Sequence, residues 1–333
     1  MRALVQDTYG SADVLELRDV DRPVPGDREV LVRVHAAGID RGVWHLVTGL
    51  PYPARLAFGL RRPRVPVPGM DVAGVVEAVG PEVTRFAVGD EVFGIGRGTF
   101  AEYAVAAEDK LARRPGRLTA TEAAVLAVTG STALQAVDDH GRVTRGDHVL
   151  VLGASGGVGT YAVQVAKARG ATVTGVASTA KLDLVRDLGA DHVVDYIRTG
   201  PVDGSARYDV VIDCGGATPL RRLRRALTPT GTLVIVGGEG GGRWIGGLDR
   251  QVRAKLLSPV LRQRLTTFVA REDAEHLEAL AGLVDRGELT PVVDRTYPLA
   301  DAPLALADLA AGRARGKLVV AVHEAPRPVH PLG

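Results

Sequence analysis

One stretch, from Asp147 to Gly170, constrains the fold of this chain more than any other. It opens with the apolar run 149–152, which is typical of a strand buried on both faces of a parallel sheet. A glycine-rich turn, 153–159, follows, and the residues after it have helical spacing. A second apolar strand, 172–177, completes the unit. The order strand, glycine turn, helix, strand predicts a βαβ unit that binds a dinucleotide.

The glycine turn has a definite physical task. Gly156 lets the backbone approach a pyrophosphate closely, because no Cβ intervenes, and Gly159 lets the helix pack tightly on the strand. The helix N-terminus adds free N–H groups and the positive end of a dipole, which attract phosphates. The turn departs from the pattern G-x-G-x-x-G at its first glycine, which is Ala154 here. An ordinary glycine-rich connection in another α/β protein is the alternative.

The segment GASGGVGTYAVQVAKARGATVTGVAS, residues 153–178, resembles the medium-chain dehydrogenase/reductase superfamily. Within it, the zinc-free quinone oxidoreductase branch is the most similar, with AxGGVG in place of GxGxxG. Residues 69–94 resemble the superfamily's N-terminal barrel signature, and residues 289–322 resemble its C-terminal return. The resemblance covers nearly the whole chain. It implies an α/β protein with a doubly wound parallel (Rossmann) nucleotide-binding domain and a GroES-like β-barrel catalytic domain.

The order of predicted elements agrees with two domains, which a length of 333 residues allows. Short strands separated by Gly and Pro fill the first 124 residues, among them a half-buried strand at 30–34. Residues 119–139 have a helical pattern, and strands alternate with helices from 147 to about 270, as in a doubly wound sheet. We expect a catalytic domain over 1–124, completed by 273–333, and a nucleotide-binding domain over 125–272. The loop 49–69, rich in Pro and Arg, is either a lid or a solvated basic loop.

Composition and charge argue against several classes of protein. The 41 Lys and Arg residues against 39 Asp and Glu leave a net charge of +2, which predicts neither a nucleic-acid nor a membrane partner. A single cysteine, Cys214, excludes an internal disulfide, and no basic residue near it in sequence would make it a nucleophile. The N-terminus has no signal-peptide core, and no apolar run reaches spanning length. We expect a cytoplasmic protein.

The choice of cofactor depends on the end of the second strand of the unit. NAD-specific sites usually place Asp or Glu there, bound to the ribose 2′-hydroxyl. This chain has Ala177, Ser178 and Thr179, followed by Lys181, so no carboxylate would repel a 2′-phosphate. A hydroxyl and an ammonium are placed to bind one, which predicts NADPH, with a solvated Lys181 as the alternative. The resemblance also implies a phosphate contact from Tyr196.

Further cofactor contacts follow from the glycine turn and from the resemblance. The turn would hold the pyrophosphate, and the resemblance implies a threonine and a glycine loop beside the nicotinamide and a closing contact near the C-terminus. Helix capping by the threonine and simple turns at the glycines are the alternatives. The predicted contacts are Thr132, Ser155, Gly156, Gly157, Val158, Gly237, Gly238 and Lys317.

A catalytic zinc ion is not predicted. Zinc-dependent relatives take a cysteine from the segment matching 37–42 and a His-Glu pair from the segment matching Met70 and Asp71. Here Asp40 lies near the first place, and methionine is a poor zinc ligand at the second. A new metal site formed by Asp40, His45 and Asp71 is the alternative, although their spacing matches no known pattern.

Three residues are candidates for the chemistry. Asp40 stands where many relatives have Asn, and it could orient a neighbour or contact the nicotinamide ribose. His45 could lie in the pocket or pack in the core. Tyr52 resembles a tyrosine of zinc-free enoyl reductases, and its phenol can donate a hydrogen bond and protonate an enolate. Packing of Tyr52 on the barrel is the alternative.

The sequence therefore predicts a zinc-independent, NADPH-dependent oxidoreductase that transfers hydride to quinones or α,β-unsaturated carbonyls. Without a Lewis acid, the anion left by hydride transfer needs a hydrogen-bond donor and then a proton. A pathway-specific enoyl reductase and a non-catalytic NADPH-binding sensor or interaction protein are the alternatives. The resemblance also implies a homodimer formed through the edge strand 265–269.

Overall fold

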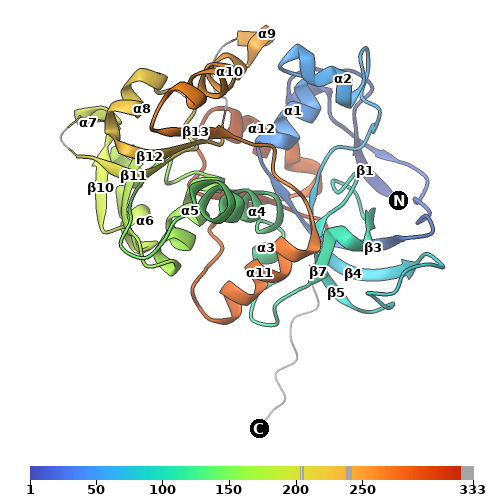
Figure 1. The fold of residues 1–333 in the computed structure, drawn as a ribbon. Coiled ribbons are helices and arrows are strands. Elements are labelled where there is room, and N and C mark those ends of the chain that lie inside the picture. The colour runs from blue at the N-terminus through green and yellow to red at the C-terminus, as the bar shows by residue number, and fades with distance from the viewer. Residues whose placement is uncertain (203, 205, 238–241, 324–333) are drawn as a thin grey trace.

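Two lobes lie side by side in the computed structural model of the protein, which describes residues 1–202, 204, 206–237 and 242–323 (Figure 1). One lobe is built on a six-stranded sheet and the other on a seven-stranded sheet. All strand pairs of the first sheet are parallel, whereas most pairs of the second are antiparallel. The predicted α/β fold class, with a doubly wound parallel sheet beside a second domain, is confirmed.

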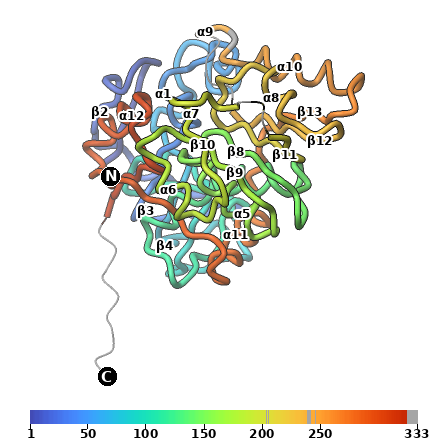
Figure 2. Tube along the Cα trace, turned by 90° about the vertical axis from the view of Figure 1, so that its left-hand side faces the viewer, coloured from blue at the N-terminus to red at the C-terminus, as the bar shows by residue number. Residues whose placement is uncertain are grey.

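The parallel sheet has the strand order β10-β9-β8-β11-β12-β13, so the chain extends first to one side of β8 and then to the other. Helices α8 and α10 cover one face, and α5 and α6 lie on the other (Figure 1 and Figure 2). The strands are β8 (His148–Leu152), β9 (Thr172–Ala177), β10 (His192–Asp195), β11 (Tyr208–Asp213), β12 (Leu227–Ile235) and β13 (Arg264–Thr267). The helices are α4 (Ala127–Gln135), α5 (Gly157–Ala168), α6 (Leu182–Asp187), α7 (Tyr196–Thr199), α8 (Leu220–Ala226), α9 (Gly242–Ile245) and α10 (Leu248–Leu257).

Strand β8 is buried on both faces, as its apolar run predicts. Val149 and Val151 belong to the core cluster shared with α4, α5 and α11. Leu150 and Leu152 point to the other side and pack with residues of α8 and α10. Because successive side chains of a strand point to opposite faces, a continuous apolar run fills both cores at once.

The second sheet combines strands from both ends of the chain. Strand β3 is central, and the late strand β15 pairs with it antiparallel, placing Leu318 opposite Ile39. The chain therefore returns to its first domain after the nucleotide-binding domain. The strands of this sheet are β3 (Glu29–Ile39), β4 (Asp71–Val79), β5 (Glu91–Ile95), β6 (Tyr103–Ala107), β7 (Leu111–Arg113), β14 (Val293–Pro298) and β15 (Lys317–Ala321). Strands β1 (Arg2–Val5) and β2 (Glu16–Asp19) pair with each other in a separate two-stranded sheet. The helices are α1 (Arg41–Thr48), α2 (Arg55–Phe58), α3 (Ala120–Ala123), α11 (Ala274–Asp285) and α12 (Ala302–Ala310).

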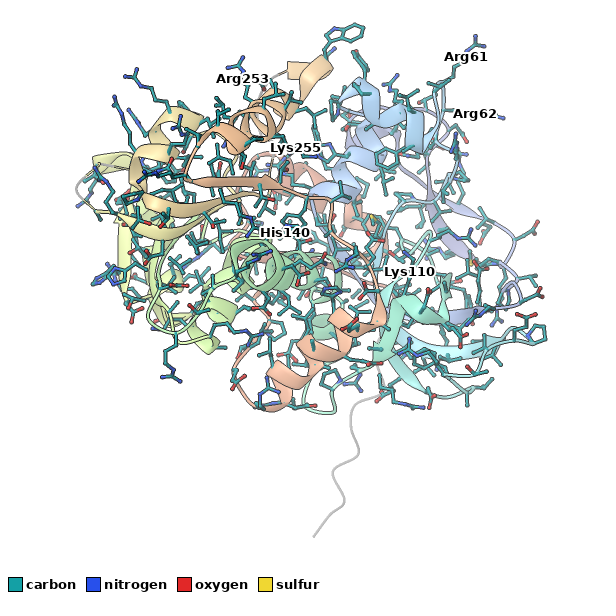
Figure 3. All side chains as sticks on the ribbon, in the orientation of Figure 1. Arg61, Arg62, Lys110, His140, Arg253 and Lys255 are labelled. Carbon is teal, nitrogen blue, oxygen red and sulfur yellow. The ribbon has the colours of Figure 1, made fainter. Side chains whose placement is uncertain are left out.

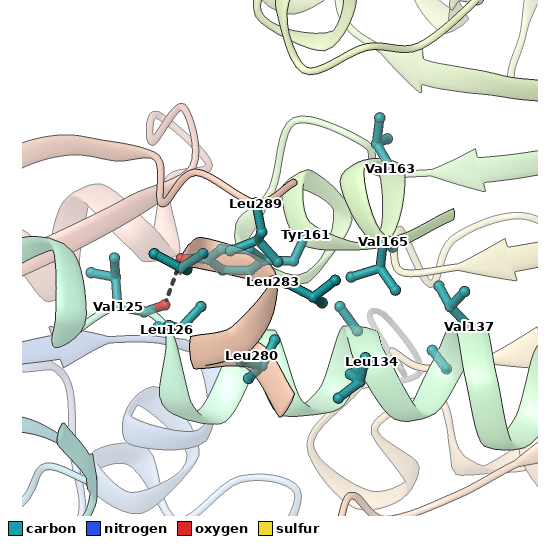
Figure 4. Packing of buried hydrophobic residues seen from close by; sticks show 14 of the residues in the cluster. Val125, Leu126, Leu134, Val137, Tyr161, Val163, Val165, Leu280, Leu283 and Leu289 are labelled. Atoms are coloured by element: carbon teal, nitrogen blue, oxygen red, sulfur yellow. Dashed lines mark hydrogen bonds between the residues drawn. The ribbon is translucent and has the colours of Figure 1, made fainter. Parts of the chain in front are cut away.

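A buried cluster joins α5 to the return helix α11. Tyr161 of α5 is fully buried, and its hydroxyl donates a hydrogen bond to the carbonyl oxygen of Val125 at 2.9 Å (Figure 4). Leu280 and Leu283 of α11 pack in the same cluster. Burial, with a smaller contribution from Asp71, raises the pKa of Tyr161 well above its ordinary value, so the hydroxyl remains a neutral donor.

Three predicted segments differ from the structure. The helical pattern at 119–139 is divided into α3, which begins at a capping box at Thr119, α4 and a π-helical turn, Ala136–Gly141. The loop 49–69 contains a short 3-10 turn, Tyr52–Ala54, and α2. The strand at 30–34 is part of the long strand β3, where Leu31 is buried as well as its apolar neighbours, so this segment is covered on both faces.

Candidate active site

A cavity of about 770 Å³ lies between the two domains. Its lining on one side comes from the carboxyl ends of β8, β9, β11 and β12, and on the other from the start of α1 and the segment 312–317. The carboxyl edge of an open parallel sheet is where such folds bind ligands. The predicted site residues that line it are Asp40, His45, Thr132, Ser155, Gly156, Gly157, Val158, Ser178, Lys181, Tyr196, Gly237 and Lys317.

The glycine turn has contacts that a side chain would break. A Cβ on Gly159 would lie 2.1 Å from the carbonyl oxygen of Gly153 and 2.8 Å from the Cα of Ala154. Gly156 is the N-cap of α5, and within the described part of the chain no side chain caps this helix end. The first N–H groups of α5 are therefore left for a ligand in the cavity. This cradle fits the pyrophosphate of a dinucleotide.

Ser178, Lys181 and Tyr196 line the cavity where the 2′-phosphate of NADPH is expected. The neighbouring carboxylate of Asp195 is already engaged. It accepts a hydrogen bond from the hydroxyl of Thr179 at 2.5 Å and another from a backbone N–H two residues further on. These bonds leave Asp195 poorly placed to replace the missing ribose-binding acid.

The ammonium of Lys181 links the nucleotide-binding domain to the segment after α12. It donates hydrogen bonds to the carbonyl oxygens of Gly312 at 3.0 Å and Ala314 at 2.6 Å. Partial burial lowers the pKa of Lys181. The alternative of a solvated Lys181 is wrong, because the side chain is half-buried and bonded to the other domain.

The predicted contacts to the nicotinamide come from two parts of the chain. Thr132 lies inside α4, where its hydroxyl donates to the carbonyl oxygen of Val128 at 2.6 Å, so the alternative of helix capping is wrong. Gly237 follows β12 and lines the cavity, whereas Gly238 lies outside the described residues. Burial raises the pKa of the Cys214 thiol, which also lines the cavity, so it stays neutral and is a poor nucleophile.

Three charged side chains, Asp40, Asp71 and Lys317, meet beside the glycine turn, and we call them the buried triad. The ammonium of Lys317 lies 3.0 Å from Asp71 Oδ2 and 3.6 Å from Asp40 Oδ2. The second oxygen of Asp71 accepts the N–H of Val128 at 2.7 Å, and Asp40 Oδ1 accepts the N–H of Val43 at 2.9 Å as N-cap of α1. The triad thus connects β4, β15, α1 and α4.

Burial and charge act against each other within the buried triad. Burial raises the pKa of Asp71 to about 6, which Lys317 opposes and Asp40 reinforces. Burial alone would lower the pKa of Lys317, but the attraction of Asp71 and Asp40 outweighs it and raises that pKa. Asp71 therefore titrates close to neutral pH, whereas Lys317 remains a cation.

The structure places His45 in the cavity but not Tyr52. His45 lines the cavity, and its Nδ1 lies 2.5 Å from the carbonyl oxygen of Leu50. Among the described residues, Tyr52 is not part of the cavity lining. Its ring packs edge-on against Trp244 with centroids 5.0 Å apart, and the guanidinium of Arg55 lies 4.9 Å above it. The catalytic role of Tyr52 stays a prediction.

A second cavity, of about 490 Å³, lies in the catalytic domain next to the first. His45 lines the first cavity and Leu46 the second. Met70 lines the second, and its sulfur would lie 3.6 Å from a Cβ on Gly42, which lines the first. The two cavities therefore adjoin at the start of α1. The larger apolar side chains in the lining of the second include Leu46, Phe58, Val65, Val67, Met70 and Ile95.

The second cavity also has charged side chains in its lining. Arg97 pairs with Glu29 at 2.8 Å, and Lys110 approaches Glu272 at 3.5 Å. Within these two pairs the charges cancel, but Arg64 also lines the cavity and adds one positive charge to a lining that is otherwise mostly apolar. Elsewhere on the loop 49–69, Arg61 and Arg62 point away from the molecule (Figure 3).

Comparisons with known proteins agree with this architecture. A family model described as "Alcohol dehydrogenase GroES-like domain" matches residues 26–116, and one described as "Zinc-binding dehydrogenase" matches residues 188–320. The chain is 33% identical to the chloroplast envelope quinone oxidoreductase homolog of Arabidopsis thaliana, over 96% of this chain and 98% of the relative. The chain belongs to the quinone oxidoreductase branch of the medium-chain dehydrogenase/reductase superfamily.

Solved structures support the assignment of the chain to this family. The quinone oxidoreductase of Coxiella burnetii has a TM-score of 0.83 at 29% identity, covering 97% of this chain and 99% of its own. A mycobacterial protein solved in complex with NADPH also has a TM-score of 0.83, at 30% identity, covering 97% of this chain and 100% of its own. The predicted GroES-like character of the first domain is therefore confirmed.

No group of three or more His, Cys, Asp or Glu side chains in residues 1–202, 204, 206–237 and 242–323 is arranged to hold a metal ion. Within the same ranges, every helix is too short or too polar to cross a bilayer.

Sequence reasoning missed the part that Asp71 has in the site. Asp71 was considered only as a metal ligand, and Lys317 only as a cofactor contact. The two form a direct buried ion pair although 246 positions separate them in the chain. The signal that could have found the pair is a charged residue at the start of each of two largely apolar strands, because such residues are rarely buried unless they are paired.

Proposed function

We propose that this oxidoreductase is a zinc-independent reductase that uses NADPH to transfer hydride to quinones or α,β-unsaturated carbonyls. The observation that carries the proposal is a single cavity that runs from Lys181 past the glycine turn to Thr132 and Asp40, beside an apolar second cavity. The names of the relatives support quinones as acceptors, and the mycobacterial complex supports NADPH.

The lining of the first cavity supports NADPH as the cofactor. The N–H groups at the start of α5 would bind the pyrophosphate, and Ser178, Lys181 and Tyr196 the 2′-phosphate. Thr132 and Gly237 would hold the nicotinamide end. NADPH supplies the hydride when it is bound. The absence of Asp or Glu at the end of β9 favours NADPH over NADH.

The second cavity supports a neutral, largely apolar acceptor. Its apolar side chains suit a flat quinone or enone, and Arg64 is the one charge of its lining outside the two ion pairs. Zinc independence rests on Met70 at the place of a zinc ligand in zinc-dependent relatives. A pathway-specific enoyl reductase and a non-catalytic NADPH-binding sensor remain the alternatives.

The test is oxidation of NADPH by purified protein with a panel of neutral quinones and enones, before and after incubation with a chelator. We expect turnover with at least one member, no stoichiometric zinc by elemental analysis and no loss of activity with chelator. Turnover limited to one enoyl thioester would favour the enoyl reductase, and binding of NADPH without any turnover would favour the sensor. One zinc per chain, lost together with activity, would overturn zinc independence.

We also propose a homodimer formed on the side of β13 and α10. Strand β13 is at the edge of its sheet, although Ser258 Oγ already accepts the N–H of Leu265. Val252 and Leu256 lie one turn apart on α10 with 56% and 72% of their surface exposed. Exposed apolar side chains beside an edge strand favour contact with a second copy.

Light scattering coupled to size exclusion should give the mass of two chains for the wild-type protein. Leu256→Asp should shift the mass towards one chain, because it puts a charge into the apolar contact. Leu304→Asp is the matched control, since Leu304 is 61% exposed on α12 of the other domain. A monomeric wild type, or an equal effect of both substitutions, would contradict this interface.

A further inference from the structure

The chain makes a short turn directly after β11, and this turn forms part of the wall of the first cavity. We call residues 213–218 the β11 turn. It leaves the strand at Asp213, which is fully buried. The members of the turn that line the cavity are Cys214, Gly215, Ala217 and Thr218. The shape of the β11 turn therefore contributes to the shape of the cavity.

The β11 turn is packed between two glycines of the same cavity. A Cβ on Gly153, directly after β8, would lie 3.1 Å from the backbone nitrogen of Gly215. A Cβ on Gly237, after β12, would lie 3.0 Å from the carbonyl oxygen of Cys214. Both glycines line the cavity. A displacement of the β11 turn would therefore disturb the glycine turn on one side and the predicted nicotinamide contact on the other.

Three hydrogen bonds hold the β11 turn in its shape. Asp213 Oδ1 accepts the N–H of Gly216 at 3.1 Å. Asp213 Oδ2 accepts a hydrogen bond from the guanidinium of Arg250. The same guanidinium also donates to the carbonyl oxygen of Gly216. Arg250 thus reaches both ends of this part of the turn with its planar fork of donors.

Arg250 belongs to α10, which lies outside the cavity. Among the described residues that line the cavity, none comes from α10. The side chain of Arg250 is 13% exposed and that of Asp213 0%, so the ion pair is largely shielded from water. Without the guanidinium, the Asp213 carboxylate would be an uncompensated buried charge. The shape of the β11 turn therefore depends on a side chain from outside the cavity.

We propose that Arg250 is a positioning residue for the cofactor, which acts through Asp213 and Gly216 to hold the β11 turn in the shape that NADPH binds. Helix α10 is then part of the cofactor site although it does not touch the cofactor. This inference rests on the proposed function, because it takes the first cavity as the NADPH site.

Arg250→Met should weaken binding of NADPH and of NADH alike, each by at least about tenfold, because the unpaired Asp213 carboxylate forces the β11 turn to open towards water. The two cofactors should lose equally, since both use this wall of the cavity. In steady-state kinetics the KM for NADPH should rise with little change in kcat, as expected when uniform binding is lost. Titration of the protein's fluorescence measures the two Kd values.

The Kd separates this role from a merely structural one. Measured well below the Tm, it reports on folded molecules, so an ion pair that only stabilises the fold would lower the Tm and leave both Kd values unchanged. If Arg250→Met does not fold, Arg250→Lys replaces it. Lysine keeps the charge but lacks the fork that reaches Asp213 and Gly216 together, so both Kd values should rise at least about threefold.

Arg253→Met is the matched control, because Arg253 lies three residues further along α10, is 71% exposed and pairs only with Asp249 at 3.6 Å among the described residues. It should leave both Kd values unchanged. Wild-type affinity in the folded Arg250 variant, a loss confined to NADPH, or an equal loss in the Arg253 variant would overturn the proposal.

The failure of this proposal and that of the reductase function are distinguishable, because the Kd values require no turnover. If Arg250→Met weakens both cofactors but the wild type reduces no quinone or enone, the reductase function fails while the role of Arg250 stands. If the wild type turns over and the Arg250 variant binds both cofactors normally, the reverse holds. A wild type that binds neither cofactor would overturn both.

Discussion

Gly159→Ala should weaken binding of NADPH by at least about 10²-fold, which corresponds to roughly 2.7 kcal/mol. The added Cβ would lie 2.1 Å from the carbonyl oxygen of Gly153 and 2.8 Å from the Cα of Ala154. Both atoms belong to the backbone, so α5 itself must move away from β8. The N–H groups that would hold the pyrophosphate move with it. Titration of the protein's fluorescence with NADPH measures the change.

Gly282→Ala is the matched control for this substitution. Gly282 also lies in a helix, α11, and the nearest atom to its added Cβ is the end of the flexible side chain of Arg286, at 3.3 Å. Alanine in place of glycine inside a helix should stabilise the protein by up to about 1 kcal/mol. NADPH affinity should not change. Equal affinities for the Gly159 variant and the wild type would show that the turn is not the phosphate cradle.

Lys181→Ala should raise the Kd and KM for NADPH more than tenfold and leave those for NADH nearly unchanged. A hydrogen bond to a charged group contributes about 1.5–3 kcal/mol, and only NADPH has the 2′-phosphate to lose it. The structure adds a second effect, because Lys181 also holds the carbonyl oxygens of Gly312 and Ala314. Loosening that segment would affect both cofactors alike, so the ratio of the two Kd values isolates the phosphate contact.

Lys167→Ala is the matched control. Lys167 is another half-buried lysine of the same domain, paired with Asp191 at 2.8 Å and outside the cavity lining. Its removal should leave both Kd values unchanged. An equal loss of affinity for NADPH and NADH in the Lys181 variant would remove the support for a 2′-phosphate site.

Much of the cofactor half of the candidate site could be predicted because its residues lie in one short segment of the chain. The glycine turn, the start of α5 and the end of β9 all fall between 153 and 181, so local spacing places them together. The same locality explains why β8 was recognised as buried on both faces. Thr132 and Gly237, which lie far from the turn, were placed by resemblance, and the structure brings both to the same cavity.

The catalytic half was less predictable because its residues come from distant strands. His45 could be pocket or core from its sequence alone, and the structure places it in the cavity. Tyr52 looked equally able to act or to pack, and its ring lies against Trp244 from the other domain. Contacts between the two domains depend on how the domains pack together, and the local pattern of residues in the sequence does not indicate this packing.

The sequence by itself determined the βαβ unit, the family and the preference for NADPH that follows from the missing acid. Each of these conclusions depends on residues that lie close together in the sequence. Only the tertiary structure decided that Asp40, Asp71 and Lys317 form one buried triad. Lys317 reaches the carboxylates because β15 pairs with β3 directly before Asp40, while β4 pairs with the other edge of β3 and begins at Asp71. Pairing of strands remote in sequence follows from the whole fold, and so does the charge balance it creates.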